Sequence, residues 1–411
     1  TFNTYPMIPQ INITPSIYYV GVNDRTKDLF ESMWPLPHGV SYNSYLIVDE
    51  KITLIDTVDI CYSEQFFRQI ERIIGDRPID YLVINHMEPD HSGSIGMLQR
   101  HYPNIQLVGN KKTFNMLQAY YPDLKAELIT VNDGDTLSTG KHNLSFIMAP
   151  MVHWPEVMFT YDATEGVLFS ADAFGTFGTL DSHVLDHKLS LEMYYTEMYR
   201  YYACIVGKYG PFVQKALTKV LGMNLTLNAI CSTHGPVWTK EGFPRALAIY
   251  DQLSKYDTTK GAVVLYGSMY GNTTVMADTI ARGLGEAGIK EVVCHDVSRT
   301  NPSYILRDLF RYRALVVGCP TYSNEIYMPI QNMLNMIRLR EVKNHICAIF
   351  GSCSWAGQAV RKLTPFAEEM GWELIGTPLE QMGAPNEDDL NKAFELGKEV
   401  AARLHELYPE A

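Results

Sequence analysis

Hydrophobic and polar positions follow two different rhythms along the chain. In the first 250 residues, short β-rich apolar segments are interrupted by helical stretches. The predicted strands are Ile17–Val22, Tyr45–Val48, Ile52–Asp56, Tyr81–Asn85, Gln106–Gly109, Asn143–Met148, Gly166–Ser170 and Leu227–Cys231. Helices are predicted at Ser63–Ile74, at Lys111–Tyr120 and in an aromatic-rich stretch around Leu189–Tyr209. Several strands run directly into polar clusters, which is where the loops of layered α/β folds carry chemistry.

The second rhythm begins after a polar stretch without a clear period, Tyr250–Gly261, where we place a domain boundary. We therefore expect two domains, at residues 1–254 and 255–411. Beyond the boundary, the predicted strands are Ala262–Tyr266, Val292–Asp296, Leu315–Gly318 and Ile346–Phe350. One helix is predicted after the polar loop that follows the first of these strands, and it ends at about Ala287. Further helices are predicted at Ser303–Phe310, Pro329–Leu339 and Gln358–Met370, and from Glu387 to about Leu407. This alternation indicates a doubly wound, five-stranded parallel sheet.

Composition narrows the class of protein. The 411 residues carry 34 Lys and Arg against 46 Asp and Glu, a net charge of −12, which disfavours nucleic acid or an anionic membrane as partner. No apolar run reaches the roughly 18–20 residues that a membrane helix needs, and no basic-then-apolar leader opens the chain, so we expect a cytoplasmic protein. The seven cysteines include no C-x-x-C pair, which argues against a disulfide scaffold, a zinc ribbon or a rubredoxin-type iron site.

Potential metal ligands are concentrated directly after the predicted strand Tyr81–Asn85. His86, Glu88, Asp90 and His91 lie within six residues, and imidazole nitrogens and carboxylate oxygens suit zinc or iron. Three more candidates follow later strands: His153, Asp172 and His234. A single histidine after a strand is more often a hydrogen-bonded loop residue, but the dense cluster does not fit that interpretation. Seven ligands are too many for one tetrahedral site and suit two adjacent ions, with Asp172 as a bridge.

Three polar loops at strand ends form a separate candidate site in the second half. The first loop, Gly267–Thr274, precedes a helix, and its backbone N–H groups are suited to wrap a phosphate. It is neither a Walker loop nor a dinucleotide fingerprint, because no Gly-Lys-Ser/Thr follows and its glycines are wrongly spaced. The candidate binding residues on the three loops are Ser268, Met269, Tyr270, Gly271, Asn272, Thr273, Pro320, Thr321, Tyr322, Ser352, Cys353, Ser354, Trp355 and Gly357.

The ligand motif, together with the later candidates His153, Asp172 and His234, resembles the metallo-β-lactamase superfamily. Most hydrolases of that superfamily carry His where this chain has Glu88. With Glu88, Asp90 and Asp172 the site supplies three carboxylates, a harder and more anionic set that favours iron. The form His86-x-Glu88-x-Asp90-His91 resembles the flavodiiron proteins. That resemblance implies that His86, Glu88 and His153 hold one iron, that Asp90 and His234 hold the other, and that Asp172 bridges them. His91 matches the motif as well and is the lowest-ranked ligand.

The three later loops resemble the short-chain flavodoxin fold, which binds FMN, and Tyr322 or Trp355 is suited to stack on the flavin ring. The resemblance therefore covers nearly the whole chain. It implies an αββα sandwich of the metallo-β-lactamase type that carries two iron ions, followed by a flavodoxin-like FMN domain.

The activity implied by the resemblance is an oxidoreductase. FMN takes electrons from a separate donor, either rubredoxin or a reduced deazaflavin coenzyme, and the diiron pair reduces dioxygen to water, nitric oxide to nitrous oxide, or both. Members of the family form head-to-tail homodimers, so a homodimer or a dimer of dimers is expected. Two alternatives stay open: a zinc hydrolase of the metallo-β-lactamase class with an appended flavodoxin, and a pure electron carrier that binds FMN but no metal.

Overall fold

The computed structural model describes residues 9–410 and divides the chain into two compact units. The first unit comprises residues up to 201 together with 211–251, and the second comprises residues 202–210 together with those from 252 onward. A short connection joins helix α7 (Phe243–Ser254) to strand β18 (Thr259–Tyr266). The expected boundary between residues 254 and 255 stays a prediction.

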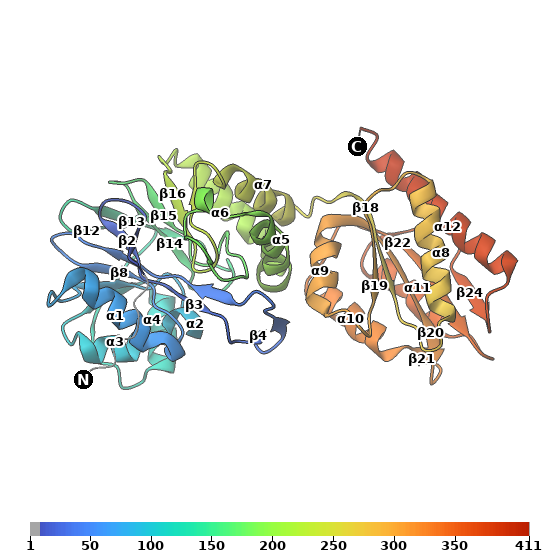
Figure 1. Cartoon of the computed structure of the whole chain (residues 1–411), viewed down its shortest axis with the longest axis horizontal. Coiled ribbons are helices and arrows are strands. Elements are labelled where there is room, and N and C mark those ends of the chain that lie inside the picture. The colour runs from blue at the N-terminus through green and yellow to red at the C-terminus, as the bar shows by residue number, and fades with distance from the viewer. Residues whose placement is uncertain (1–8, 411) are drawn as a thin grey trace. The chain divides into compact units, whose positions relative to one another are not determined.

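The first unit is built on two packed sheets (Figure 1). One sheet has the strand order β1-β2-β7-β8-β9-β10-β11 and turns from antiparallel to parallel at β8. Its strands are β1 (Ile11–Asn12), β2 (Ile17–Tyr19), β7 (Tyr45–Ile47), β8 (Thr53–Ile55), β9 (Tyr81–Val83), β10 (Gln106–Gly109) and β11 (Glu127–Thr130). The other sheet follows chain order, with β12 (Thr136–Ser138), β13 (Asn143–Met148), β14 (Met158–Asp162), β15 (Val167–Phe169), β16 (Ala229–Cys231) and β17 (Trp238–Thr239).

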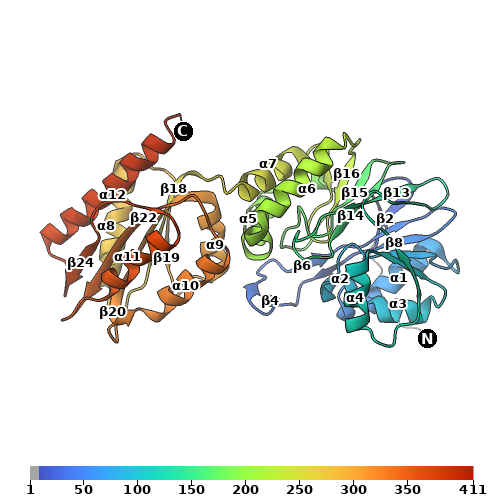
Figure 2. The ribbon, with the colours of Figure 1, turned by 180° about the vertical axis from the view of Figure 1, so that it is seen from behind.

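Helices cover both outer faces of this pair of sheets, which completes the expected αββα sandwich (Figures 1 and 2). On one side lie α1 (Ser63–Ile74), α3 (Ile95–His101) and α4 (Lys111–Tyr120), and on the other lie α6 (Gly210–Gly222) and α7. Helix α1 is strongly amphipathic and buries Phe66, Phe67, Ile70 and Ile74. Two short ribbons, β3 (Val22–Asp24) with β6 (Val40–Tyr42) and β4 (Leu29–Phe30) with β5 (Trp34–Pro35), complete the unit.

The aromatic-rich stretch that was predicted as one helix is three different helical segments. Helix α5 covers Glu192–Tyr201, a π-helical turn follows at Tyr202–Val206, and a 3₁₀ turn covers Gly207–Tyr209. Short 3₁₀ turns also occur at Ile60–Tyr62 and Asp186–Lys188. The hydrophobic period survives such changes of pitch, so the sequence pattern does not reveal them.

The second unit is the expected doubly wound sheet, with five parallel strands in the order β19-β18-β20-β22-β24. Besides β18, these are β19 (Val292–Asp296), β20 (Tyr312–Tyr322), β22 (Ile346–Cys353) and β24 (Leu379–Met382), with short additions at β21 (Glu325–Ile326) and β23 (Glu373–Leu374). Its helices are α8 (Asn272–Glu286), α9 (Pro302–Arg311), α10 (Met328–Leu339), α11 (Ala359–Glu369) and α12 (Glu387–Leu407).

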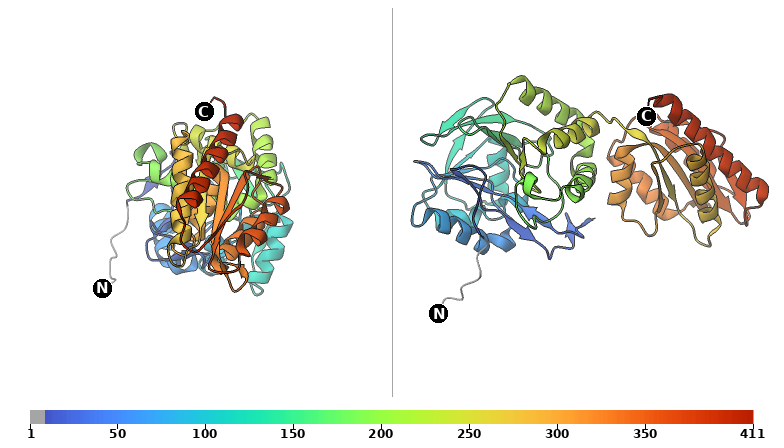
Figure 3. Two further views of the ribbon diagram at one scale, coloured as in Figure 1. Left: turned by 90° about the vertical axis from the view of Figure 1, so that its right-hand side faces the viewer. Right: turned by 45° about the horizontal axis from the view of Figure 1, so that its top comes forward.

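Helices α8 and α12 lie together over one face of this sheet, while α9 and α10 lie over the other (Figures 1 and 3). Alanine, valine and leucine side chains of α8 and α12 form a continuous buried core with strands β18, β20 and β22. The first candidate loop follows β18, whereas β20 and β22 are longer than predicted and contain part of the other two candidate segments at their carboxyl ends, at the same edge of the sheet. These strand residues are Pro320, Thr321, Tyr322, Ser352 and Cys353. Across residues 9–410, no helix combines the length and apolar character needed to cross a bilayer.

Candidate metal centre and flavin loops

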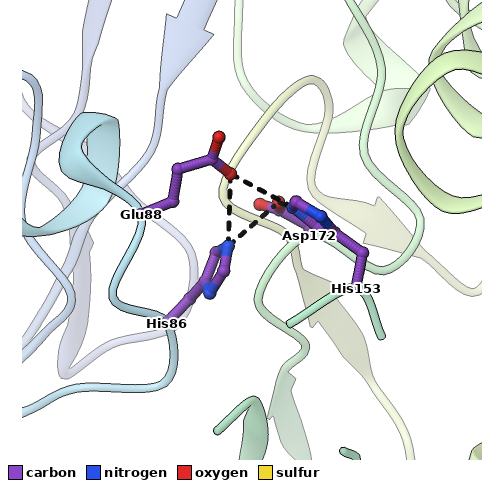
Figure 4. A group of neighbouring side chains, drawn as sticks. All are labelled: His86, Glu88, His153 and Asp172. Carbon is purple, nitrogen blue, oxygen red and sulfur yellow. Dashed lines mark hydrogen bonds and ion pairs between the residues drawn. The ribbon is translucent and has the colours of Figure 1, made fainter. Parts of the chain in front are cut away.

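Four of the seven predicted ligands converge on one point in the first unit (Figure 4). His86 and Glu88 follow β9, whereas His153 and Asp172 follow β13 and β15 of the other sheet. Glu88 Oε2 lies 3.3 Å from His86 Nε2 and 3.1 Å from His153 Nε2. Asp172 Oδ2 lies 3.0 Å from His153 Nε2 and 3.5 Å from His86 Nε2. Two imidazole nitrogens and two carboxylates from both sheets therefore face one another.

The remaining three predicted ligands, Asp90, His91 and His234, form a second group. His91 Nε2 lies 3.0 Å from His234 Nε2, and the two oxygens of Asp90 lie 3.3 Å from these two nitrogens. Asp90 and His91 lie on a short helix, α2 (Pro89–Ser92), that begins directly after Glu88. The helix starts with a proline at its first position, which favours helix initiation there.

Asp172 lies between the two groups. Its Oδ2 atom faces His86 and His153, while its Oδ1 atom lies 3.2 Å from His91 Nε2 and 3.8 Å from His234 Nε2. Thr233 donates a hydrogen bond from Oγ1 to the same Oδ1 atom, which fixes the carboxylate between the groups. The two oxygens of one carboxylate thus point to two neighbouring donor sets.

The donor chemistry fits metal ions better than a self-contained hydrogen-bond network. Both oxygens of Asp90 are buried without a hydrogen-bond partner, although such orphaned groups are costly. Two ring nitrogens at 3.0 Å are also the spacing that one ion, bound about 2.1 Å from each, would span. Because Asp172 serves both groups, the residues fit a pair of adjacent ions.

Two contacts that the sequence analysis missed orient the histidine rings. Glu156 Oε1 lies 2.8 Å from His86 Nδ1 and also accepts a hydrogen bond from the backbone N–H of Met87 at 2.9 Å. His234 Nδ1 donates to the backbone carbonyl of Ser41 at 2.7 Å. In both rings Nε2 is thereby directed at the centre, a common arrangement for metal-binding histidines. Glu156 lies three residues after His153, and that spacing is the signal that could have identified it.

An aromatic wall from three elements covers the second donor group. The rings of Phe30, Tyr42 and Tyr201 lie 5.4, 6.0 and 5.6 Å from the His234 ring, measured between centroids. All three side chains are almost completely buried, and the Tyr201 hydroxyl has no hydrogen-bond partner. The wall excludes water from this side of the centre and strengthens electrostatic interactions within it.

The electrostatics of the centre are those of a buried cluster of opposite charges. Burial by itself lowers the pKa of His153, but hydrogen bonds to Asp172 and Glu88 outweigh it and raise that pKa to about 9. Burial by itself raises the pKa of Asp172, but the facing histidines His86 and His91 hold it well below its ordinary value. Asp56, which accepts a hydrogen bond from the backbone N–H of Asn85, behaves differently: burial raises its pKa to about 6.

In the second unit, hydrogen bonds join the three predicted flavin loops. Thr273 Oγ1 of the first loop lies 2.9 Å from Ser352 Oγ of the third. Thr321 Oγ1 of the second loop accepts hydrogen bonds from the backbone N–H groups of Gln358 and Ala359, at 2.9 and 3.0 Å, where α11 begins. The candidate residues on these loops are thus gathered at one edge of the sheet.

The first of these loops leaves the amino end of α8 open. Gly271, the residue that precedes the helix, has a left-handed backbone (φ 97°), and no side chain caps the first turn. Ser268 Oγ accepts a hydrogen bond from the Gly271 N–H at 3.2 Å, which shapes the loop without closing the helix end. Free N–H groups at the start of a 15-residue helix provide the chemistry that a phosphate needs.

Exposed rings border the same edge of the sheet. Tyr270 and Trp355 are 88% and 82% exposed, and Tyr322 is 49% exposed. Large aromatic side chains with so little cover are unusual for a monomer surface and are typical of ligand or partner contacts. The loops therefore fit a phosphate-bearing group with a flat aromatic ring.

Comparisons with known proteins agree with this geometry. Residues 40–235 match the model of the ODP family beta lactamase, and residues 264–397 match that of flavodoxin. The chain is 31% identical over 400 residues to a nitric oxide reductase of Moorella thermoacetica, which covers 97% of this chain and 100% of that protein. Among solved structures, it is similar to rubredoxin oxygen:oxidoreductase of Desulfovibrio gigas, with 27% identity and a TM-score of 0.93 over 98% of this chain and 100% of the other. It is equally similar to the flavodiiron protein of Giardia intestinalis, with 27% identity and a TM-score of 0.92 over 97% of this chain and 98% of the other.

Proposed function

Because the chain belongs to the flavodiiron protein family, we propose that it is an oxidoreductase that reduces a small oxidant. FMN and a non-haem diiron pair are its cofactors, and together they carry electrons from an external donor to dioxygen, nitric oxide or both. The observation that best supports this proposal is the position of Asp172 between two donor groups. A single carboxylate that serves two sets of ligands is what a two-metal reductase requires.

We assign the metal ligands from this arrangement. His86, Glu88 and His153 would hold one iron, with Asp172 as the bridge. Asp90 and His234 would hold the other. His91 is included in this second set, because its Nε2 atom lies within 3.3 Å of both Asp90 and Asp172. Its position supports a ligand role more strongly than the sequence motif alone did.

The protein's own residues prepare the centre for this chemistry. Glu156 and the Ser41 carbonyl keep the histidine rings oriented, so the ligands need no rearrangement when metal binds. Glu88, Asp90 and Asp172 supply three negative charges, which offset the charge of two cations in a buried site. The aromatic wall keeps bulk water away from the second donor group.

The flavin loops have a complementary role. We assign the open amino end of α8, with Ser268 and Thr273, to the phosphate of FMN. Tyr322 and Trp355 are assigned to the ring, because both are exposed at the same edge of the sheet. Replacing Ser268 and Thr273 together by alanine should weaken FMN binding while leaving the metal content unchanged.

The zinc hydrolase alternative is tested by measuring the metals and the turnover of the purified protein. We expect iron, bound FMN, and consumption of dioxygen or nitric oxide when reduced donor is supplied anaerobically. Two zinc ions with hydrolytic turnover, and no reduction of either gas, would instead support the hydrolase. FMN with no metal would support the pure electron carrier.

The electron donor is proposed to be rubredoxin or a reduced deazaflavin coenzyme. The solved relative from Desulfovibrio gigas is named for its reaction with rubredoxin, which supports the first of these. A stopped-flow experiment that offers each reduced donor to the oxidised protein, followed by dioxygen or nitric oxide, would identify both the donor and the preferred oxidant. Fast flavin reduction by only one donor would decide between them.

We further propose a head-to-tail homodimer, alone or paired into a dimer of dimers, and a cytoplasmic location. Exposed rings around the flavin loops are suited to contact with a second protein surface. Light scattering at several protein concentrations gives the oligomeric state, and cell fractionation gives the location.

A further inference from the structure

A small apolar cavity lies in the first unit, between the helices α6 and α7 and the strands β14, β15 and β16. Its volume is about 30 Å³. Every side chain that lines it is hydrophobic, with the single hydroxyl of Tyr250 as the exception. That hydroxyl donates to the backbone carbonyl of Asp172 at 3.4 Å, so its polarity is already used.

The buried part of the cavity lining includes close chain neighbours of two proposed metal ligands. Val152 lines it and immediately precedes the ligand His153, while Ala173 and Phe174 line it and immediately follow the ligand Asp172. Tyr250 connects the cavity wall directly to the Asp172 backbone. Four lining residues are thus attached to two of the proposed ligands.

Other residues of the cavity lining lie at the surface of the first unit. Leu221, at the end of α6, is 56% exposed, and Leu227 and Phe243 are half-buried. By contrast, Val152, Ala173 and Tyr250 are almost fully buried. The lining therefore includes one exposed leucine as well as buried residues that are close in the chain to two proposed ligands.

The physical properties of this cavity select its occupant. A cavity needs about 10–15 Å³ to accept a water molecule, so this one is large enough, but water also needs polar partners that these walls lack. Apolar gas molecules need no such partners, and they are driven from water into apolar surroundings. Ions and polar solutes are excluded because they would lose their hydration.

The slight solvent exposure of the centre lies on residues outside the cavity lining. Of the proposed ligands, Glu88, Asp90 and His153 keep 7%, 6% and 5% exposure, whereas His91 is 1% exposed and His86, Asp172 and His234 are 0% exposed. None of these three partly exposed residues lines the cavity, whose walls are apolar.

From these observations, we propose that the cavity between α6 and α7 is a binding site for an apolar diatomic gas on its way to the metal centre. The proposal rests on the proposed function, because it concerns how the oxidant reaches the same site. It assigns roles to Ala216 and Leu221 of α6, which line the cavity and are not among the proposed metal ligands.

The binding test uses krypton, an apolar gas of about the size of dioxygen that does not react with metals. Crystals of the holoprotein are pressurised with krypton, and its anomalous signal is located. We expect krypton in the cavity lined by Val152, Ala173 and Ala216. No krypton in that cavity would overturn the proposal.

The kinetic test fills the cavity from the helix side. Ala216→Leu adds bulk to the lining, and we expect it to remove the krypton signal and to raise KM for the gas several-fold. The value of kcat at saturating gas should not change, because no ligand is altered. The control is Thr218→Leu, which makes a similar change at an exposed position of the same helix and should leave both krypton binding and KM unchanged.

A second variant guards against misfolding of the first. Leu221→Trp narrows the mouth of the cavity at a residue that is already 56% exposed, so it is well tolerated by the core. An unchanged KM in either folded variant, with iron and FMN at parental levels, would contradict the proposal. If the parental holoprotein reduces neither gas, the proposed function is wrong. The gas-binding site is then tested independently, by krypton binding in the parental protein and its loss in Ala216→Leu.

Discussion

At the scale of single residues, the two histidines His86 and His234 each use one ring nitrogen to face the proposed metal centre and the other to fix the orientation of the ring. The ligand atoms of His86 and His234 face the centre, while their opposite nitrogens contact Glu156 and the Ser41 carbonyl. The proposed ligands come from four separate stretches of the chain, and each stretch follows a strand of one of two sheets. Removing one ligand should therefore affect the metal and leave the second unit intact.

The first prediction concerns His153 and His234. Replacing either with alanine should remove most of the bound iron and the oxidase or nitric oxide reductase activity, because each supplies a ring nitrogen that no neighbour can replace. FMN content should stay at the parental level. Elemental analysis and flavin absorbance measure both in one sample, and His101→Ala, an exposed histidine outside the centre, is the matched control. Full activity in a ligand variant would remove that residue from the assignment.

The second prediction concerns Glu156. Glu156→Gln keeps the shape of the side chain but removes the charge beside His86 Nδ1, and such changes behind a ligand typically weaken metal affinity about 10–100-fold. Iron retention during titration with a chelator is the measurement. The exposed Glu127→Gln serves as control. Equal retention in both variants would show that Glu156 does not support the ligand.

At the scale of elements, the second unit depends on how closely its helices approach one another. Gly283 of α8 and Gly397 of α12 meet where the helices cross, and an added Cβ at either position would collide with the backbone of the other helix. Gly285, two residues further along α8, faces open space. Gly283 is therefore closely packed against α12, whereas Gly285 of the same helix is not.

The third prediction follows from that difference. Gly283→Ala should destabilise the second unit by about 1–3 kcal/mol through overpacking. Gly285→Ala should be neutral or stabilise it by up to about 1 kcal/mol, because alanine is the better helix former. Denaturant unfolding followed by flavin fluorescence measures both. Equal effects of the two substitutions would contradict the close helix crossing.

The fourth prediction concerns pH and the contact between β19 and α9. Burial by itself raises the pKa of Asp308, but hydrogen bonds from His295 and Arg307 outweigh it and hold that pKa below its ordinary value. The unfolded chain therefore binds more protons than the folded one in acid. The stabilising effect is complete above the ordinary aspartate pKa, about 4, and is lost as the pH falls through the lower folded value.

We expect Asp308→Asn to lower stability at neutral pH by roughly 1–3 kcal/mol, because it removes a charged hydrogen-bond partner. Its stability should also depend less on pH in acid than that of the parent. Unfolding midpoints of the second unit between neutral pH and about pH 3 provide the test. Parallel pH profiles for the two proteins would exclude a lowered pKa at Asp308.

At the scale of the whole molecule, two units with different cofactors must exchange electrons. The metal centre lies in the first unit and the flavin loops lie in the second. The proposed head-to-tail dimer would bring the flavin of one chain to the irons of the other. The fifth prediction is therefore that a variant that is monomeric by light scattering transfers electrons from flavin to iron much more slowly in a single turnover. Unchanged transfer in a proven monomer would contradict the proposed dimer.

The sequence by itself predicted the fold class of both units, because the two halves of the chain differ in their pattern of apolar positions. The first half has short apolar strands interrupted by helices, and the second half alternates regularly between strand and helix. The sequence also placed β19 and α1 at their observed bounds. Strand β24 and the helices α6 and α7 were not located, although the buried residues Val213, Ala216, Leu217 and Val220 of α6 recur at helical spacing. The proposed ligands could be selected from the sequence because they lie in four segments that come after strands, and the carboxyl ends of neighbouring strands meet in space.

Only the tertiary structure decided how those residues act together. That His91 faces Asp172, that Glu156 lies behind His86, and that a cavity adjoins Val152 all depend on contacts between segments far apart in the chain. Local sequence preferences act over a few residues, whereas such contacts are set by the packing of two sheets and their helices. The sequence therefore identified the residues of the proposed metal site, and the packing of the sandwich determined their geometry.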